Sequence, residues 1–270
     1  MYYRDPALFG SQATVNRYVD DIACTFNVPR SALNVAAAAK GLVVGAINFC
    51  RRDGSKVDAV ADRDGMLVPS LKDVLSVDVK AVKWIIVVEK EASFRSITGS
   101  NLWGKLSSEG VLVTGKGYPD IATRALVHFL STPSPQNGYA SPPVYGLADF
   151  DPDGVAILST YKDGSLALAH ENAELRVPRL RWLGLKSEHI MQCGCDPSAS
   201  QGLLVLTARD RSKARKILEH NKEVEGAADR ARLIEELQVM LVLNLKAELQ
   251  LLDATTDGMV NLLQNNLGNH

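Results

Sequence analysis

Cysteine is scarce in this sequence, with four residues in 270. So few cysteines fit a reducing compartment, and the chain is long enough to bury a core without disulfides. Two of them stand in Cys193-Gly194-Cys195, which lacks the paired Cys and His residues that a zinc site requires. We therefore expect no zinc site.

Long hydrophobic runs and targeting segments are also absent. No apolar stretch approaches the roughly 18 residues that are needed to cross a bilayer. The first residues, Met1-Tyr2-Tyr3-Arg4-Asp5, form neither a signal peptide nor an Arg-rich transit segment. The sequence therefore predicts an intracellular protein with no membrane partner.

Neither sign of charge predominates. The formal net charge is -1 at pH 7, whereas nucleic-acid-binding domains are usually strongly basic. Any contact with DNA must then come from local patches. The composition, with 46% hydrophobic and 23% charged residues, is that of a soluble folded protein of one large domain or two ordinary ones.

The first seventy residues are predicted to form a small domain. Ser11 and Thr14 are capping-type residues, and a helical pattern follows them at Val15, Val19, Ile22 and Phe26, whose side chains we expect to be buried. A short helix is expected at 31–33, as in a helix-turn-helix or winged-helix unit. Residues 34–49 have both helical and strand features, and we interpret them as two strands of a wing. Pro69 and Ser70 indicate a domain boundary near residue 70.

The hydrophobic pattern changes in the middle of the chain. Short apolar runs at 84–88, 111–113 and 144–148 are separated by helical patterns, which predicts an α/β fold with a mainly parallel sheet. Ligands of such sheets gather at the carboxyl ends of the strands. Residues 131–143 are interpreted as a surface insertion, and residues 227–252 as a long helix.

Three carboxylates follow two of these predicted strands. Glu89 comes after the run 84–88, and Asp149 and Asp151 come after the run 144–148. In an extended segment residues i and i+2 point the same way, so the two aspartates can face one ion, and carboxylate oxygens suit Mg²⁺. The alternative is that Asp and Gly simply turn the chain after a strand, and the residues alone leave both interpretations open.

Several longer motifs occur in a fixed order along the sequence. VVEK followed by DFDP resembles the Toprim signature of topoisomerases and primases. The full series is YYRDPALFGSQ, KGLVVG, VVEKEASF, TGKGYPD, ADFDPDG, YKDGS and VPRLRWLGL. From Tyr2 through residues 246–248, the chain thereby resembles the family that contains the meiotic double-strand-break protein and its relative, the topoisomerase VI A subunit.

This resemblance implies two domains. A winged-helix DNA-binding domain would span residues 1–70, and a Toprim metal-binding domain with a C-terminal helical extension would span residues 71–270. The second tyrosine of the Tyr2-Tyr3 pair would be the nucleophile, attacking the phosphodiester to give a 5′-phosphotyrosyl link. Glu89, Asp149 and Asp151 would hold Mg²⁺, or Mn²⁺ in its place. The Toprim pattern ends at Asp151, so Asp153 is left out of the metal set.

The same resemblance implies partners. Tyrosine and metal of one site would come from different protomers, so that cleavage of double-stranded DNA requires a homodimer. An ATPase-type subunit resembling topoisomerase VI B and other meiotic break factors would assist, and the protein would act in the nucleus. Three cations are candidate phosphate contacts: Arg17, Arg30 and Lys40.

Some features of the sequence leave other hypotheses open. Chains of this family continue upstream of the tyrosine with further helix and an arginine that assists catalysis, so the resemblance implies N-terminal truncation. Besides a meiotic break-forming enzyme, the chain could be a type IIB topoisomerase VI A subunit. It could also be a metal-dependent nuclease in which water attacks, or a non-catalytic DNA-binding scaffold with a Toprim fold.

Overall fold

The central element of the fold is a mixed sheet. The computed structural model describes residues 2–28, 30–35, 39–59, 64–164, 175–193, 202–221, 228–252 and 258–267. Within these ranges six strands pair in the order β4 (Met66–Leu67), β1 (Leu42–Gly45), β7 (Gly110–Thr114), β6 (Trp84–Val88), β8 (Val144–Leu147) and β9 (Arg181–Gly184). The last four are mutually parallel, and β1 is antiparallel to β4 and β7. The predicted α/β class with a mainly parallel sheet is confirmed.

The apolar runs of the sequence explain why the parallel strands lie at the centre. All residues of β6, β7 and β8 are buried. Successive side chains of a strand point to opposite faces, so a continuous apolar run requires cover on both faces of the sheet. Ile85 and Ile86, which point to opposite faces, are both 0% exposed.

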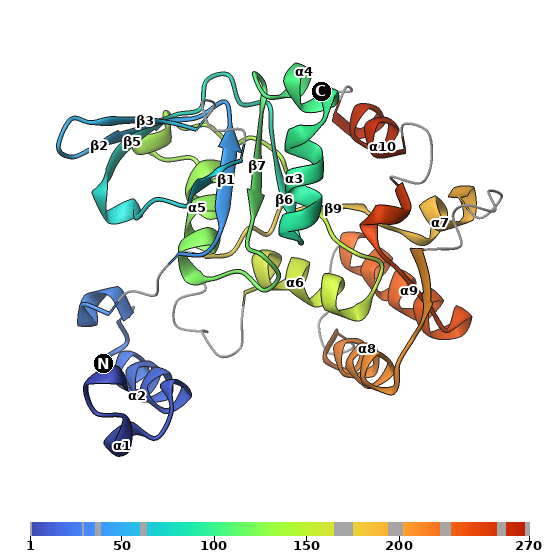
Figure 1. The fold of residues 1–270 in the computed structure, drawn as a ribbon, viewed down its shortest axis with the longest axis horizontal. Coiled ribbons are helices and arrows are strands. Elements are labelled where there is room, and N and C mark those ends of the chain that lie inside the picture. The colour runs from blue at the N-terminus through green and yellow to red at the C-terminus, as the bar shows by residue number, and fades with distance from the viewer. Residues whose placement is uncertain are drawn as a thin grey trace.

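Helices cover both faces of the sheet (Figure 1). One core lies under α3 (Glu91–Gly99), α4 (Asn101–Leu106), α7 (Ser187–Cys193), α8 (Ala208–Asn221), α9 (Ala228–Leu243) and α10 (Gly258–Leu267). The other lies under α5 (Ile121–Ser131), α6 (Pro152–Lys162) and a small antiparallel sheet of β3 (Lys56–Asp58), β2 (Asn48–Arg51) and β5 (Val74–Asp78). None of the described helices has the length and apolar character to cross a membrane.

The N-terminal helices stand apart from this sheet (Figure 1). They are η1 (Tyr2–Arg4), α1 (Pro6–Phe9), α2 (Gln12–Phe26) and η2 (Arg30–Leu33). Ser11 caps α2, its side chain accepting a hydrogen bond from Thr14 N at 3.1 Å, which confirms the predicted helix. The short helix predicted at 31–33 is present in η2.

The buried face of α2 differs from the predicted one. Val15 and Val19 are buried together with Ala23, but Ile22 is 47% and Phe26 69% exposed. The elements packed against α2 are mainly the short α1 and η2, which cover a narrow stripe of its surface. The prediction that Ile22 and Phe26 are buried is therefore wrong.

The strands between residues 34 and 49 are present but do not form a wing. β1 lies in the main sheet beside β7, and β2 pairs with β3 and β5. The hydrophobic pattern of a strand does not show which strand it pairs with. β1 is as apolar as the central strands, so its sequence is also compatible with a place in the main sheet. The main sheet thus takes strands from both sides of residue 70, and the division at that residue stays a prediction.

The long helix predicted over residues 227–252 is shorter in the structure. Residue 227 lies outside the described residues, and α9 ends at Leu243, before Asn244 at φ 52°. The chain continues as β11 (Leu245–Ala247), which pairs with β10 (Leu203–Val205), and as η7 (Leu249–Leu252). This return of the chain places C-terminal residues beside the edge where β8 ends.

Candidate active site

Glu89 and Asp149 meet at the carboxyl edge of the parallel sheet. Strands β6 and β8 are in register through the pair Val88 and Leu147, so the residues that follow them emerge together. The Glu89 carboxylate accepts a hydrogen bond at Oε2 from the backbone N–H of Asp149 at 2.9 Å. Both residues are buried, with 7% and 3% of their surface exposed. The structure therefore brings together two of the three predicted metal ligands.

Asp151 joins this edge as the N-cap of α6. Its Oδ1 accepts a hydrogen bond from Gly154 N at 2.7 Å, and Pro152 follows at the first helical position. A Cβ at Gly154 would lie 2.5 Å from the backbone oxygen of Asp149 and 3.1 Å from Glu89 Oε2. Glycine is thus what allows α6 to begin so close to the two buried acids.

Burial and nearby negative charge oppose the ionised forms of Glu89 and Asp151. Burial, followed by the charge of Asp149 and that of Asp151, raises the pKa of Glu89 to about 7. Burial also raises the pKa of Asp151, and the charges of Asp149 and Asp153 add to this effect. A bound cation or a proton would relieve this repulsion.

Lys90 and Glu248 extend the site on one side. The Lys90 ammonium lies 2.6 Å from Asp149 Oδ2 and 3.4 Å from Glu248 Oε1. Burial lowers the pKa of Lys90, but the hydrogen bond and charge of Asp149, with those of Glu248, outweigh it and raise the pKa overall. The other oxygen of Asp149, Oδ1, accepts a hydrogen bond from Leu249 N at 2.9 Å.

Lys90 and Glu248 have no role among the site residues predicted from the sequence. Glu248 reaches the site because Phe150 and Ala247 form an antiparallel bridge, with hydrogen bonds of 2.8 and 3.1 Å. Nothing in the local pattern of either segment predicts that bridge. The one signal in the sequence is the run Lys246-Ala247-Glu248, which closes the family resemblance.

Asp153 is not part of the acid group formed by Glu89, Asp149 and Asp151, because its carboxylate has other partners. Its carboxylate forms an ion pair with Lys213 of α8 and accepts a hydrogen bond from the Tyr118 hydroxyl at 3.3 Å. Lys213 also lies 5.0 Å from the centre of the Tyr118 ring. These contacts tie the loop after β7 to α6 and α8 at the rim of the site.

The donor chemistry of the acid group fits Mg²⁺ in part. Glu89 and Asp151 offer carboxylate oxygens, the hard ligands that this ion prefers. Asp149, by contrast, already accepts bonds at both oxygens, from Lys90 and from Leu249. Across the described ranges no group of three or more His, Cys, Asp or Glu side chains is arranged to hold a metal ion as it stands. The metal set Glu89, Asp149 and Asp151 stays a prediction.

Tyr3 lies with the N-terminal helices and away from these acids. It is 87% exposed on η1, in the segment that stands apart from the sheet in Figure 1. One copy of the chain therefore does not bring the predicted nucleophile to the predicted metal ligands.

The three candidate phosphate contacts have partners within the protein. Arg30 forms an ion pair with Asp20, and the Arg17 guanidinium lies 5.6 Å from the centre of the Tyr18 ring. Lys40 Nζ donates to the backbone oxygen of Lys116 at 3.3 Å. Their role in DNA binding stays a prediction.

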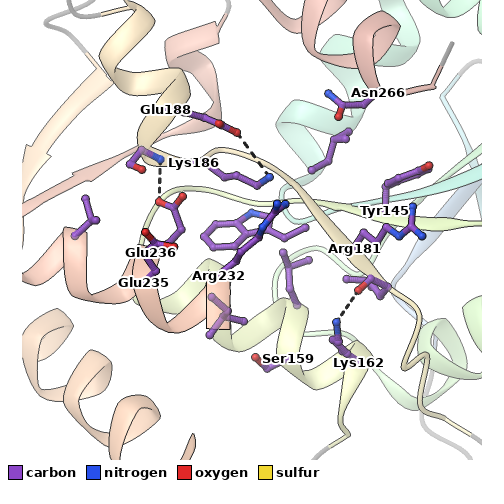
Figure 2. A pocket seen from close by; sticks show the side chains of 17 residues that line it. Tyr145, Ser159, Lys162, Arg181, Lys186, Glu188, Arg232, Glu235, Glu236 and Asn266 are labelled. Carbon is purple, nitrogen blue, oxygen red and sulfur yellow. Dashed lines mark hydrogen bonds and ion pairs between the residues drawn. The ribbon is translucent and has the colours of Figure 1, made fainter. Parts of the chain in front are cut away.

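A cavity of about 640 Å³ lies elsewhere, between β9, α6, α7 and α9 (Figure 2). Its lining carries both charge signs, and none of Glu89, Asp149 or Asp151 contributes to it. Several of its polar groups bond within the protein: Glu236 accepts from Ser187 N at 2.9 Å, and Lys162 donates to the Leu180 oxygen at 3.1 Å. The carboxyl edge of the sheet that carries Glu89, Asp149 and Asp151, called the acid edge below, is thus the stronger candidate for a catalytic site.

Comparison with known proteins identifies the family of the chain. A family model for the Toprim domain of Spo11 and the topoisomerase 6 A subunit matches residues 84–265, which include the whole acid edge. A second, described as "Type IIB DNA topoisomerase", matches residues 1–35. The chain belongs to the family of Spo11 and the topoisomerase 6 A subunit.

Relatives of this family align over most of the chain. The meiotic recombination protein SPO11 of Mus musculus is 33% identical over 253 residues, covering 90% of this chain and 61% of the mouse protein. The meiotic recombination protein W68 of Drosophila melanogaster is 30% identical, over 99% of this chain and 76% of the fly protein. The A3 subunit of DNA topoisomerase 6 of Oryza sativa is 31% identical, over 94% of this chain and 54% of the rice protein. The chain thus spans about three fifths of the length of the mouse SPO11.

Proposed function

We propose that this chain is a catalytic subunit that makes meiotic DNA double-strand breaks by topoisomerase-like transesterification. Family membership supports the reaction class, and the observation that carries the proposal is the acid edge itself. There a buried glutamate and two aspartates lie at the ends of adjacent parallel strands, and burial, with the charges of the two aspartates, raises the pKa of Glu89 to about 7. Such an edge is suited to a divalent cation and to phosphate chemistry.

The reaction exchanges one phosphate ester for another. The Tyr3 oxygen attacks the phosphorus of the DNA backbone and loses its proton, because a phenol with a reference pKa near 10 is a weak nucleophile while protonated. The bond from phosphorus to the 3′ oxygen breaks, and that oxygen takes up a proton to leave as a hydroxyl. The tyrosine remains joined to the 5′ phosphate.

Glu89, Asp149 and Asp151 are the residues that would hold Mg²⁺, with Mn²⁺ as a substitute. When bound, the ion supplies positive charge to the phosphoryl oxygens, where negative charge develops during the displacement. Glu89 is held for this task by the Asp149 N–H, and Asp151 by the start of α6. Lys213 and Lys246 are further cations close to this rim, paired with Asp153 and Asp210.

A composite site made by two copies of the chain is part of the proposal. Tyr3 is highly exposed and lies in a segment separate from the acid edge, which supports delivery of the tyrosine to the acids of a partner copy. A homodimer would then cut both strands of double-stranded DNA. An ATPase-type subunit resembling topoisomerase VI B and other meiotic break factors would act with it, in the nucleus.

Covalent trapping on DNA tests this proposal. The chain would be incubated with its ATPase-type partner, duplex DNA labelled at its 3′ ends and Mg²⁺, then denatured and examined for label on the polypeptide. The proposal predicts a labelled adduct that disappears in Tyr3→Phe. Cleavage that survives Tyr3→Phe and leaves free ends would instead establish hydrolysis by water, and DNA binding without any Mg²⁺-dependent cleavage would establish a scaffold.

A second candidate function is a topoisomerase that reseals what it cuts. The similarity to the rice protein named as the A3 subunit of DNA topoisomerase 6 favours it. Relaxation of supercoiled DNA with ATP and the partner subunit would distinguish this candidate, because a break-forming protein leaves adducts without returning closed circles.

A further inference from the structure

A metal ion that binds the Asp149 carboxylate would compete with the Lys90 ammonium for it. Its ammonium lies 2.6 Å from Asp149 Oδ2, and the Asp149 side chain is only 5% exposed. A buried carboxylate without a partner is costly, so the ion pair with Lys90 stabilises the Asp149 carboxylate. A divalent cation bound to the same carboxylate would repel the ammonium strongly at this separation.

Glu248 offers the Lys90 ammonium a second carboxylate acceptor. Its Oε1 lies 3.4 Å from the Lys90 ammonium, beyond the optimum for a charged hydrogen bond but within reach of a small change in the lysine side chain. Lys90 is 34% exposed and Glu248 46% exposed at their side chains, so both have room to move. The lysine therefore has two carboxylates between which it can be shared.

The backbone that carries Glu248 is held firmly beside the acid edge. Ala247 on one side of it bridges to Phe150 through two hydrogen bonds, and Leu249 on the other donates to Asp149 Oδ1 at 2.9 Å. The backbone N–H of Glu248 itself donates to the Gly202 oxygen at 3.3 Å. The segment is thus anchored on both sides of Glu248, while the carboxylate itself stays at the surface.

We propose that Glu248 is a positioning residue that takes over the Lys90 ammonium when a divalent cation binds, and so frees Asp149 to become a ligand. In the metal-free protein Lys90 neutralises Asp149; with the metal bound, Lys90 pairs with Glu248. This inference rests on the proposed metal site and adds an exchange of partners that controls its affinity.

A double-mutant cycle on metal affinity tests the exchange without measuring activity. Mg²⁺, and Mn²⁺ in a parallel series, would be titrated calorimetrically into the full chain and into Glu248→Gln, Lys90→Met and the double variant. We expect Glu248→Gln to weaken binding by about fivefold, the size of coupling usual for contacting groups. Lys90→Met should strengthen binding, because the competing ammonium is gone. In the Lys90→Met background, Glu248→Gln should then have no further effect.

Controls separate this exchange from simpler explanations. Glu91→Gln removes a carboxylate from the same end of the sheet, one that pairs with Lys116 and Arg95, and should change the affinity little in either background. Thermal unfolding of each variant checks that the fold is kept. If Glu248→Gln weakens binding equally with and without Lys90, Glu248 is a direct ligand and the exchange is refuted.

The failure of the metal site itself has a different signature. Glu89→Gln should abolish or greatly weaken binding in every background. Unchanged affinity in Glu89→Gln would overturn the metal site and the exchange together. Loss of binding in Glu89→Gln, with Glu248→Gln indistinguishable from the unaltered chain, would overturn the exchange alone.

Discussion

The carboxylate of Glu89 accepts a hydrogen bond from the backbone N–H of Asp149 at 2.9 Å, across two adjacent parallel strands. This bond fixes the orientation of the buried Glu89 carboxylate beside Asp149, which is also buried. It also means that the spacing of the two residues depends on the register of β6 and β8, not on loop conformation. Changes that disturb the approach of α6 to this pair should therefore disturb the site and the fold together.

Gly154→Ala is the smallest such change. The added Cβ would lie 2.5 Å from the Asp149 backbone oxygen, which cannot move without shifting the strand end. We expect a loss of about 1–3 kcal/mol in the free energy of unfolding, the usual range for overpacking. Urea denaturation would measure it.

Gly99→Ala is the matched control for that experiment. Gly99 ends α3, and a Cβ there meets nothing within 4 Å. The change should be neutral or stabilise the protein by up to about 1 kcal/mol, because alanine favours helix. If the two substitutions destabilise the protein equally, close packing around Gly154 is not the cause of the loss in Gly154→Ala.

Asp210 should give stability a defined pH dependence. Its carboxylate accepts bonds from Thr207 N and Lys246 Nζ, both at 2.9 Å. Burial raises the pKa of Asp210, but the bonds from Lys246 and Thr207 outweigh it and lower the pKa below 3.8 overall. The stabilisation is therefore complete above pH 3.8, the ordinary value, and is lost as pH falls through the lower folded-state pKa.

The variant Asp210→Asn would test that dependence. It should lower the free energy of unfolding by about 1–2 kcal/mol at neutral pH, because the charged hydrogen bond with Lys246 is lost while the amide oxygen can still accept from Thr207 N. The difference between the two proteins should stay constant from about pH 7 to 5 and shrink below about pH 4. A difference that shrinks already between pH 7 and 5 would point to another titrating group.

The strands that carry the site are predictable from the sequence because their pattern is unambiguous. The runs 84–88 and 144–148 are apolar on both faces, which buried parallel strands require, and each is followed directly by an acid. The sequence alone therefore suffices to place Glu89 and Asp149 at one edge of the sheet. Their mutual hydrogen bond is not predictable in this way, because it depends on the register of the two strands.

Long-range pairing accounts for most of what the sequence does not predict. Lys90 and Glu248 are separated by more than half of the chain and meet through the bridge of Phe150 to Ala247. Likewise, the pattern of β1 is compatible with a wing strand, yet β1 pairs with β7. The side chains of Ile22 and Phe26 fit a helical stripe, but exposure depends on what packs against α2, which the pattern does not contain.

Metal affinity should depend on Glu89 more than on acids at the opposite end of the sheet. Glu89→Gln keeps an acceptor for the Asp149 N–H and removes the charge, so Mg²⁺ affinity should fall by at least about tenfold with the fold intact. Calorimetric titration would measure it. Glu109→Gln is the control, because Glu109 precedes β7 and pairs with Lys83 at 2.9 Å; an equal effect of both substitutions would contradict a site at the carboxyl edge.

The joint action of Tyr3 and the acid edge is tested most directly by mixing two inactive variants. Tyr3→Phe and Glu89→Gln copies, distinguished by size, would be combined with labelled duplex DNA, Mg²⁺ and the ATPase-type subunit. Neither variant alone should form a DNA adduct. In the mixture, the account predicts label on the Glu89→Gln polypeptide, whose tyrosine meets the intact acids of its partner. Absence of adduct in the mixture, when unaltered chains form it under the same conditions, would contradict a site shared between two copies.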